Sequence, residues 1–285
     1  MHEASYYHHE KNYIICDLCP HKCIIKEGST GFCQTRLNKD NVLYAENYGM
    51  CTSIAIDPIE KKPLYQFYPG YSILSAGTWG CNFSCKFCQN YKISQQKAPM
   101  RYIAPQEITK IALSSGEKNI GLAYTYSEPL VWYEYICDTA PFIRKAGLKN
   151  VLVTNGFINS LPFNELLPLI DAVNIDLKSF NNDFYSSICS GDISFVKQNI
   201  EVAIKSCHTE ITTLIIPGLN DSEEEIASLS EWLAGLDADM PLHLSRYFPN
   251  YKMESPPTPI RTMYQLQNAA QKYLKNVYLG NMPQI

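Results

Sequence analysis

Apolar, strand-like runs recur six times between residues 72 and 245, and all but the first are followed directly by a helical stretch. The predicted strands cover 72–76, 120–124, 150–154, 172–176, 209–216 and 242–245. The predicted helices cover 130–145, 163–169, 195–206, 222–236 and 262–274. Such alternation is typical of an α/β chain with a parallel sheet. Six units predict a partial (β/α)6 barrel of the TIM type, preceded by a small cysteine-rich N-terminal segment.

A cysteine motif follows the first predicted strand, where Cys81, Cys85 and Cys88 have the spacing C-x3-C-x2-C. Three thiolates on one loop can hold three irons of a [4Fe-4S] cluster, which leaves the fourth iron open, whereas clusters that only transfer electrons usually have four cysteine ligands. An open iron can bind a small molecule, and S-adenosylmethionine (SAM) is the expected one. The alternatives are structural or chance cysteines, or half of a zinc site; the full spacing favours the cluster.

The composition argues against nucleic acid and membrane partners and indicates a cellular compartment. The net charge of −4 provides no basic field for nucleic acid or an anionic membrane, and no run of about 18 apolar residues predicts a membrane span. The polar start lacks the apolar core of a secretory signal. Eleven cysteines therefore indicate metal ligands in the reducing cytoplasm rather than disulfides.

Four further cysteines lie close together near the N-terminus, namely Cys16, Cys19, Cys23 and Cys33. So short and polar a segment cannot bury a good core alone, and a metal would stabilise it. Four thiolates suit tetrahedral zinc and suit a second iron–sulfur cluster equally well, with His21 as a spare ligand. Four unligated thiols are the remaining alternative.

The stretch from residue 41 to 70 links this segment to the barrel, so we expect the domains to be 1–70, the cysteine-rich segment with its linking strip, and 71–285, the core. Three prolines discourage regular structure in the strip. It is either a solvated loop held by its aromatic side chains, or a lid or docking strip beside the active site.

Polar residues follow the predicted strands at their carboxyl ends, where parallel barrels place their active sites. The candidate SAM-binding residues on this rim are Ser127, Glu128, Asn155, Asp176, Lys178 and His243. Glu128 can accept a charge-assisted hydrogen bond from an ammonium group, helped by Ser127, and Lys178 can balance a carboxylate.

The other three candidates have less specific roles. His243 can donate to the carboxylate or the ribose of SAM. Asn155 and Asp176 can bind ribose hydroxyls, backbone or a nearby cation. No general base is needed for the expected chemistry.

Several stretches together carry a family resemblance: CDLCPHKC at 16–23, DPIEKKPLY at 57–65, the CNFSCKFCQN loop at 81–90, YSEP at 126–129 and HLSRY at 243–247. On these, the chain resembles the radical SAM proteins related to pyruvate formate-lyase activating enzyme, and most closely the AmmeMemoRadiSam system radical SAM enzymes. The usual Gly-Gly-Glu-Pro motif is Tyr-Ser-Glu-Pro here, which keeps the carboxylate of Glu128 but not the close backbone approach of two glycines.

The resemblance implies a [4Fe-4S] cluster and SAM, cleaved reductively to a 5′-deoxyadenosyl radical that removes hydrogen from a substrate. It implies that Phe87 packs against the adenine, that the reductant is of the flavodoxin or ferredoxin type, and that the enzyme works anaerobically. A protein or peptide substrate is one branch, including glycyl radical formation; a small molecule or RNA is the other. A cluster protein without catalysis and a zinc-stabilised interaction module remain as alternatives.

Four cysteines lie outside both motifs. Cys137 and Cys207 fall in predicted helices, where packing in the core is the expected role. Cys189 follows the fourth strand and is either a core residue or a hydrogen donor at the mouth of the site. The pattern assigns no role to Cys51.

Overall fold

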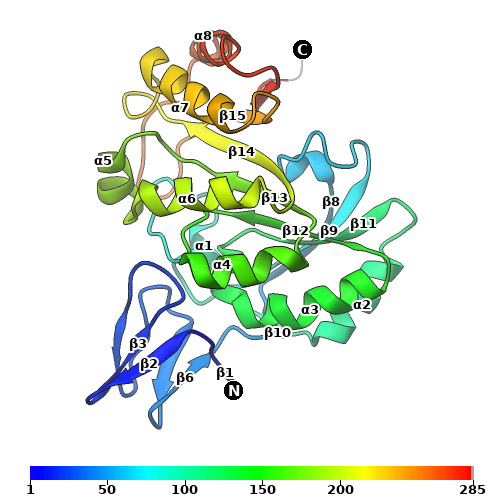
Figure 1. Ribbon diagram of the computed structural model, residues 1–285, viewed down its shortest axis with the longest axis vertical. Helices are drawn as coiled ribbons and strands as arrows, with labels where there is room; N and C mark the ends of the chain where they lie inside the picture. The colour runs from blue at the N-terminus through cyan, green and yellow to red at the C-terminus, as the bar shows by residue number, and fades with distance from the viewer. Residues whose placement is uncertain (284–285) are drawn as a thin grey trace.

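The structure, a computed structural model, describes residues 1–283 and is built around one twisted sheet (Figure 1). Among the described residues the sheet has eight strands in the order β16-β15-β14-β13-β12-β11-β9-β8. The strands are β8 (Ser53–Pro58), β9 (Ser72–Gly77), β11 (Asn119–Tyr124), β12 (Lys149–Thr154), β13 (Ala172–Asp176), β14 (His208–Ile215), β15 (Leu242–Arg246) and β16 (Val277–Gly280). Neighbours from β9 to β16 are parallel, which confirms the predicted partial (β/α)6 barrel.

Helices connect successive parallel strands, and in Figure 1 they lie along one side of the sheet. They are α2 (Pro105–Ser114), α3 (Tyr133–Lys145), α4 (Ser160–Leu166), α6 (Ile193–Ala203), α7 (Glu223–Leu236) and α8 (Ile260–Ala270). The shorter turns of helix are η1 (Ile59–Lys61), α1 (Tyr91–Ser94), η2 (Pro129–Trp132), η3 (Leu167–Leu169), α5 (Asn182–Phe184) and η4 (Tyr185–Cys189). Ser222 caps α7 as the sequence predicts, because its side chain accepts the backbone N–H of Glu225 over 3.1 Å.

Two parts of the sheet differ from the sequence prediction. The prolines of the linking strip were expected to discourage regular structure, yet β8 pairs antiparallel with β9 along its whole length. The strand is at the edge of the sheet and Pro58 is its last residue, a position where a missing N–H is tolerated. A seventh parallel strand, β16, follows α8, and the sequence analysis missed both this strand and α2.

The N-terminal segment forms two small antiparallel sheets beside the barrel (Figure 1). One contains β1 (His2–Glu3), β6 (Val42–Ala45) and β5 (Arg36–Lys39), the other β2 (Tyr7–Glu10), β3 (Tyr13–Cys16) and β4 (Ile24–Lys26). A short antiparallel pair joins β7 (Met50–Cys51), which precedes β8, to β10 (Arg101–Tyr102), which follows the cysteine loop. A buried ion pair of 2.7 Å between Arg36 and Glu134 of α3 fastens the segment to the core.

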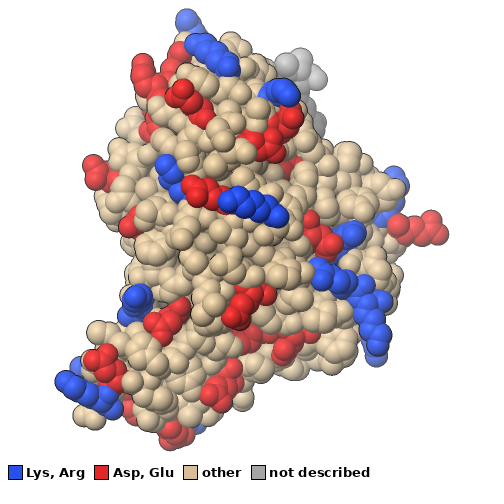
Figure 2. Space-filling model, in the orientation of Figure 1, with Lys and Arg blue, Asp and Glu red and all other residues tan. Residues whose placement is uncertain are grey.

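The surface carries charges of both signs. On the face shown in Figure 2, acidic and basic side chains are interspersed without a broad field of one sign. None of the helices in the described chain has both the length and the apolar character needed to cross a lipid bilayer.

Candidate active site

A cavity of about 380 Å³ opens at the carboxyl ends of the central strands. The three cysteines of the C-x3-C-x2-C loop, Cys81, Cys85 and Cys88, lie in its wall. Six other predicted site residues line the same cavity: Phe87, Ser127, Glu128, Asn155, Asp176 and Lys178. Residues from four separate loops therefore meet where the sequence analysis expected them to meet.

Polar groups surround two of the three sulfurs. The backbone N–H of Phe83 donates to Cys81 Sγ over 3.3 Å, and Asn155 Nδ2 donates to the same sulfur over 3.8 Å. Cys88 Sγ is 3.2 Å from the hydroxyl of Ser94. Donors to sulfur stabilise a thiolate and tune a metal centre bound to it.

The remaining cysteine of the loop, Cys85, lies next to a π-helical turn, η4 (Tyr185–Cys189). The neighbouring thiol of Cys189 lowers the pKa of the Cys85 thiol. The carbonyl of Cys189 accepts the N–H of Ser84 over 2.9 Å. Cys189 is fully buried and is absent from the cavity wall, so the structure places it behind Cys85.

Glu128 lies in the turn after β11 with its carboxylate buried. One oxygen accepts the N–H of Leu130 (2.9 Å) and the hydroxyl of Thr154 (2.6 Å), and the other accepts the N–H of Asn155 (2.8 Å). Burial raises the pKa of Glu128 to about 7, although these three donors oppose the rise. A carboxylate has about four acceptor sites, so one remains for a ligand.

Asp176 and Lys178 follow β13 and form an ion pair of 2.9 Å. Lys178 Nζ is also 5.9 Å from the centre of the Phe87 ring. Burial lowers the pKa of Lys178, but Asp176 and Cys85 more than offset this, and the pKa is well above its usual value. Lys178 is thus a fixed positive charge beside the cysteine loop.

The structure does not bring His243 to the cavity. Its Nε2 is hydrogen-bonded to Glu210 of β14 over 2.6 Å, and its ring stacks on Tyr278. Glu210 is fully buried and was missed by the sequence analysis. A single acidic residue within the apolar run 209–216 was the signal that could have identified it.

The linking strip borders the cavity, which favours the second of the two interpretations made from the sequence. Lys61, Lys62 and Pro63 are part of the cavity wall. Lys62 is buried, forms an ion pair of 2.8 Å with Asp57, and lies 4.6 Å from the centre of the Tyr126 ring. The part of the strip around Lys62 is therefore packed against the barrel.

The family model described as the radical SAM superfamily matches residues 77–230, more than half of the chain. This chain belongs to the radical SAM superfamily. The match begins at the end of β9 and includes the cysteine loop and the ends of β11 to β14 that form the cavity.

This radical SAM protein is similar to two relatives and one solved structure of the following kinds. It is 43% identical to the uncharacterized protein MJ0808 of Methanocaldococcus jannaschii, over 99% of this chain and 86% of the relative. It is 27% identical to the putative glycyl-radical enzyme activating enzyme MJ1632 of the same organism, over 70% and 77%. A domain of pyruvate-formate lyase-activating enzyme from Bacteroides vulgatus shares the fold with a TM-score of 0.50 and 23% identity, over 56% of this chain and 99% of that domain.

Radical SAM proteins use a [4Fe-4S] cluster and SAM, and the residues of this cavity fit both. Three sulfurs lie in its wall, and donors to two of them are in place. A carboxylate and a lysine, Glu128 and Lys178, lie at the same cavity, as a ligand with an ammonium and a carboxylate group requires. The volume is within the range of pockets that bury small molecules.

Proposed function

We propose that this protein is a radical SAM enzyme whose cluster is held by Cys81, Cys85 and Cys88 and which removes hydrogen from a protein or peptide substrate. The observation that carries the proposal is the meeting of this cysteine loop with Glu128 and Lys178 at one cavity. When bound, the cluster and SAM supply the one-electron cleavage that yields the 5′-deoxyadenosyl radical.

The side chains of this radical SAM protein bind and orient SAM in this proposal. Glu128 accepts from the ammonium group through its remaining acceptor site, and Lys178 pairs with the carboxylate. Asn155 and Asp176 bind ribose hydroxyls, Phe87 packs against the adenine, and Ser127 assists Glu128. For His243 we propose a positioning role, because its Nε2 is already bonded to Glu210.

A protein substrate is supported by the name of the relative MJ1632, a putative glycyl-radical enzyme activating enzyme. The linking strip gives such a substrate a place to dock, since Tyr68 of the strip and Tyr71 directly after it are exposed close in sequence to the cavity-lining Lys61 and Lys62. The reductant is a one-electron protein of the flavodoxin or ferredoxin type. All eleven cysteines are free thiols, which supports a reducing, cytoplasmic compartment.

Anaerobic reconstitution with iron and sulfide, followed by incubation with SAM and dithionite, tests the chemistry. We expect 5′-deoxyadenosine from the wild type and none from Cys85→Ala, with Cys207→Ala as a matched control far from the cavity wall. Production by Cys85→Ala at the wild-type rate would refute the cluster assignment.

The substrate class needs a second measurement. A stable glycyl radical signal in electron paramagnetic resonance, formed on a glycyl radical enzyme supplied as partner, supports protein activation. Consumption of a metabolite or modification of RNA, with no radical on any protein partner, would replace that part of the proposal.

A further inference from the structure

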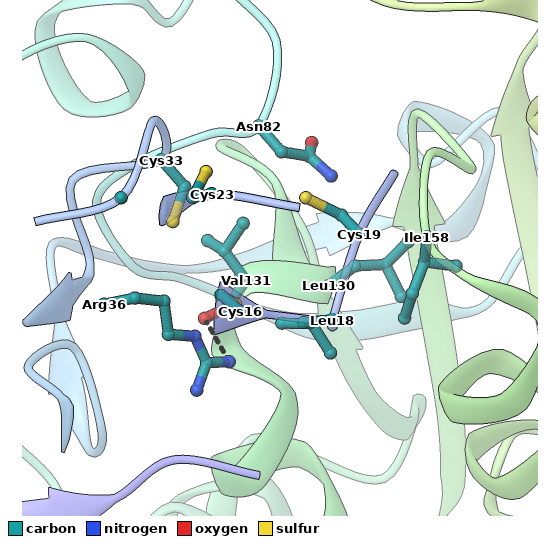
Figure 3. A pocket seen from close by; sticks show the side chains of 11 residues that line it. Cys16, Leu18, Cys19, Cys23, Cys33, Arg36, Asn82, Leu130, Val131 and Ile158 are labelled. Atoms are coloured by element: carbon teal, nitrogen blue, oxygen red, sulfur yellow. Dashed lines mark hydrogen bonds between the residues drawn. The ribbon is translucent and has the colours of Figure 1, made fainter. Parts of the chain in front are cut away.

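The four N-terminal cysteines meet at one cavity, although strand β4 and the loops on either side of it separate the first from the last. Cys16 ends β3, Cys19 and Cys23 lie in the loop before β4, and Cys33 precedes β5. All four line the same small cavity, and Figure 3 shows the sulfurs of Cys19, Cys23 and Cys33 turned toward the same space. Four free thiols around one space, those of Cys16 and Cys33 buried and those of Cys19 and Cys23 half-buried, have no packing rationale of their own.

The hydrogen bonding of these sulfurs resembles that of the active-site loop. The N–H of Phe32 donates to Cys23 Sγ over 3.3 Å, and the N–H of Phe83 donates to Cys81 Sγ over the same distance. Backbone N–H groups aimed at sulfur favour the thiolate, which is the form that binds metal.

Arg36 provides an independent observation that points to an anionic occupant. Its guanidinium lines the cavity and is 1% exposed. It donates to Glu134 over 2.7 Å and to the carbonyl of Val131 over 3.4 Å, but its Nε–H has no partner among the described residues. A buried N–H costs free energy when it is unpaired, so an acceptor such as a metal-bound thiolate is expected there.

Four thiolates around one space are the ligand set of a structural zinc ion and of a [4Fe-4S] cluster. The backbone N–H to sulfur bond that this set shares with the Cys81 loop, the motif at which this superfamily binds a [4Fe-4S] core, favours the cluster.

The cavity adjoins the active site. The side chain of Asn82, the residue after Cys81, is part of its wall, and the carbonyl of Asn82 is 2.7 Å from His21 Nε2. A β-carbon placed on Gly80 would lie 2.6 Å from the carbonyl oxygen of Cys33. The two cysteine loops are therefore packed backbone against backbone.

We propose that Cys16, Cys19, Cys23 and Cys33 bind a second [4Fe-4S] cluster next to the SAM site. This site is independent of the proposed catalytic cluster, since none of its four ligands belongs to the C-x3-C-x2-C loop. Arg36 donates through Nε–H to one of its thiolates.

The decisive variant removes the active-site ligands and leaves the N-terminal four. We expect Cys81→Ala/Cys85→Ala/Cys88→Ala, reconstituted anaerobically with iron and sulfide, to retain about four irons and four sulfides per chain, against about eight in the wild type. Reduction of this variant should give the electron paramagnetic resonance signal of a [4Fe-4S]⁺ cluster. One zinc per chain with no iron, or no metal at all, would overturn the proposal.

A converse variant separates this proposal from the proposed function. Cys19→Ser/Cys23→Ser should lose about half of the iron, while Cys207→Ser keeps all of it. If the triple-alanine variant holds a cluster and the converse variant holds none, the N-terminal site is established and the catalytic assignment fails. If the converse variant does not fold, the iron content of the triple-alanine variant still decides.

Discussion

Glu210 is a buried carboxylate with four hydrogen-bond partners, and it allows a quantitative prediction. It is fully buried on β14. Its two oxygens accept the N–H groups of Tyr65 (3.0 Å) and Gln66 (2.8 Å) and are bonded to His208 (2.8 Å) and His243 (2.6 Å). It therefore anchors the linking strip to the sheet.

The size of the effect follows from the pKa of Glu210. Burial alone would raise this pKa, but the four partners lower it from 4.5 to about 2. A lowering of this size, at about 1.4 kcal/mol per pH unit, corresponds to about 3 kcal/mol of folding free energy. Because the folded pKa is the lower one, this stabilisation is present above pH 4.5 and is lost as the pH falls through 2.

We expect Glu210→Gln to lower the free energy of unfolding by about 3 kcal/mol at pH 7, since an amide keeps the shape but not the charge. Urea titration of the cofactor-free protein, followed by circular dichroism, measures this. The matched control Glu231→Gln changes an exposed residue of α7 and should alter the value by less than about 0.5 kcal/mol. The difference between wild type and Glu210→Gln should shrink between pH 4.5 and pH 2; equal stability of the two at pH 7 would refute the reasoning.

Three further changes test the site and its supports. Lys178→Ala should weaken SAM binding at least tenfold in equilibrium dialysis, since a charge-assisted bond contributes about 1.5–3 kcal/mol; unchanged affinity would remove Lys178 from the SAM site. Glu128→Gln should destabilise the fold by about 1–3 kcal/mol in urea, because the amide faces two N–H donors and one hydroxyl; a change below about 0.5 kcal/mol contradicts this. Gly80→Ala should cost more stability than Gly218→Ala, because both have positive φ but only the first meets a backbone oxygen, that of Cys33; equal losses in thermal melts would contradict the packing of the two cysteine loops.

The parallel strands were predictable because both of their faces are buried, which produces uninterrupted apolar runs. The run 172–176 coincides with β13, and the others differ from the observed strands by a residue or so at their ends. The apolar runs did not reveal the two edge strands of the sheet, β8 and β16. β8 includes Asp57 and Pro58, and β16 is short and only partly buried, so neither has the composition of a central strand.

The candidate site was predictable wherever the residue stands at the end of its strand. Asp176 is the last residue of β13, and Glu128 follows β11. His243 is the second residue of β15, and Ser245, two residues further along, is the one that lines the cavity. Two residues of strand cover about 6.6 Å, so His243 lies too deep in the barrel. The sequence showed that His243 belongs to a strand. It did not show how far His243 lies from the carboxyl end of that strand, because this distance depends on where the strand begins and ends.

His243, deep in the barrel, helps to hold the linking strip at the wall of the cavity, because it is bonded to Glu210. Glu210, held by His243, fixes the backbone at Tyr65 and Gln66, and the carbonyl of Pro63 accepts Asn174 Nδ2 over 2.8 Å. These bonds keep Pro63 and its neighbours at the wall of the SAM cavity. Because residues 63–66 of the strip are not part of a strand, their position depends on these side chains of the barrel interior. Loss of the Glu210 charge should therefore loosen the cavity wall as well as the fold, although Glu210 itself is absent from that wall.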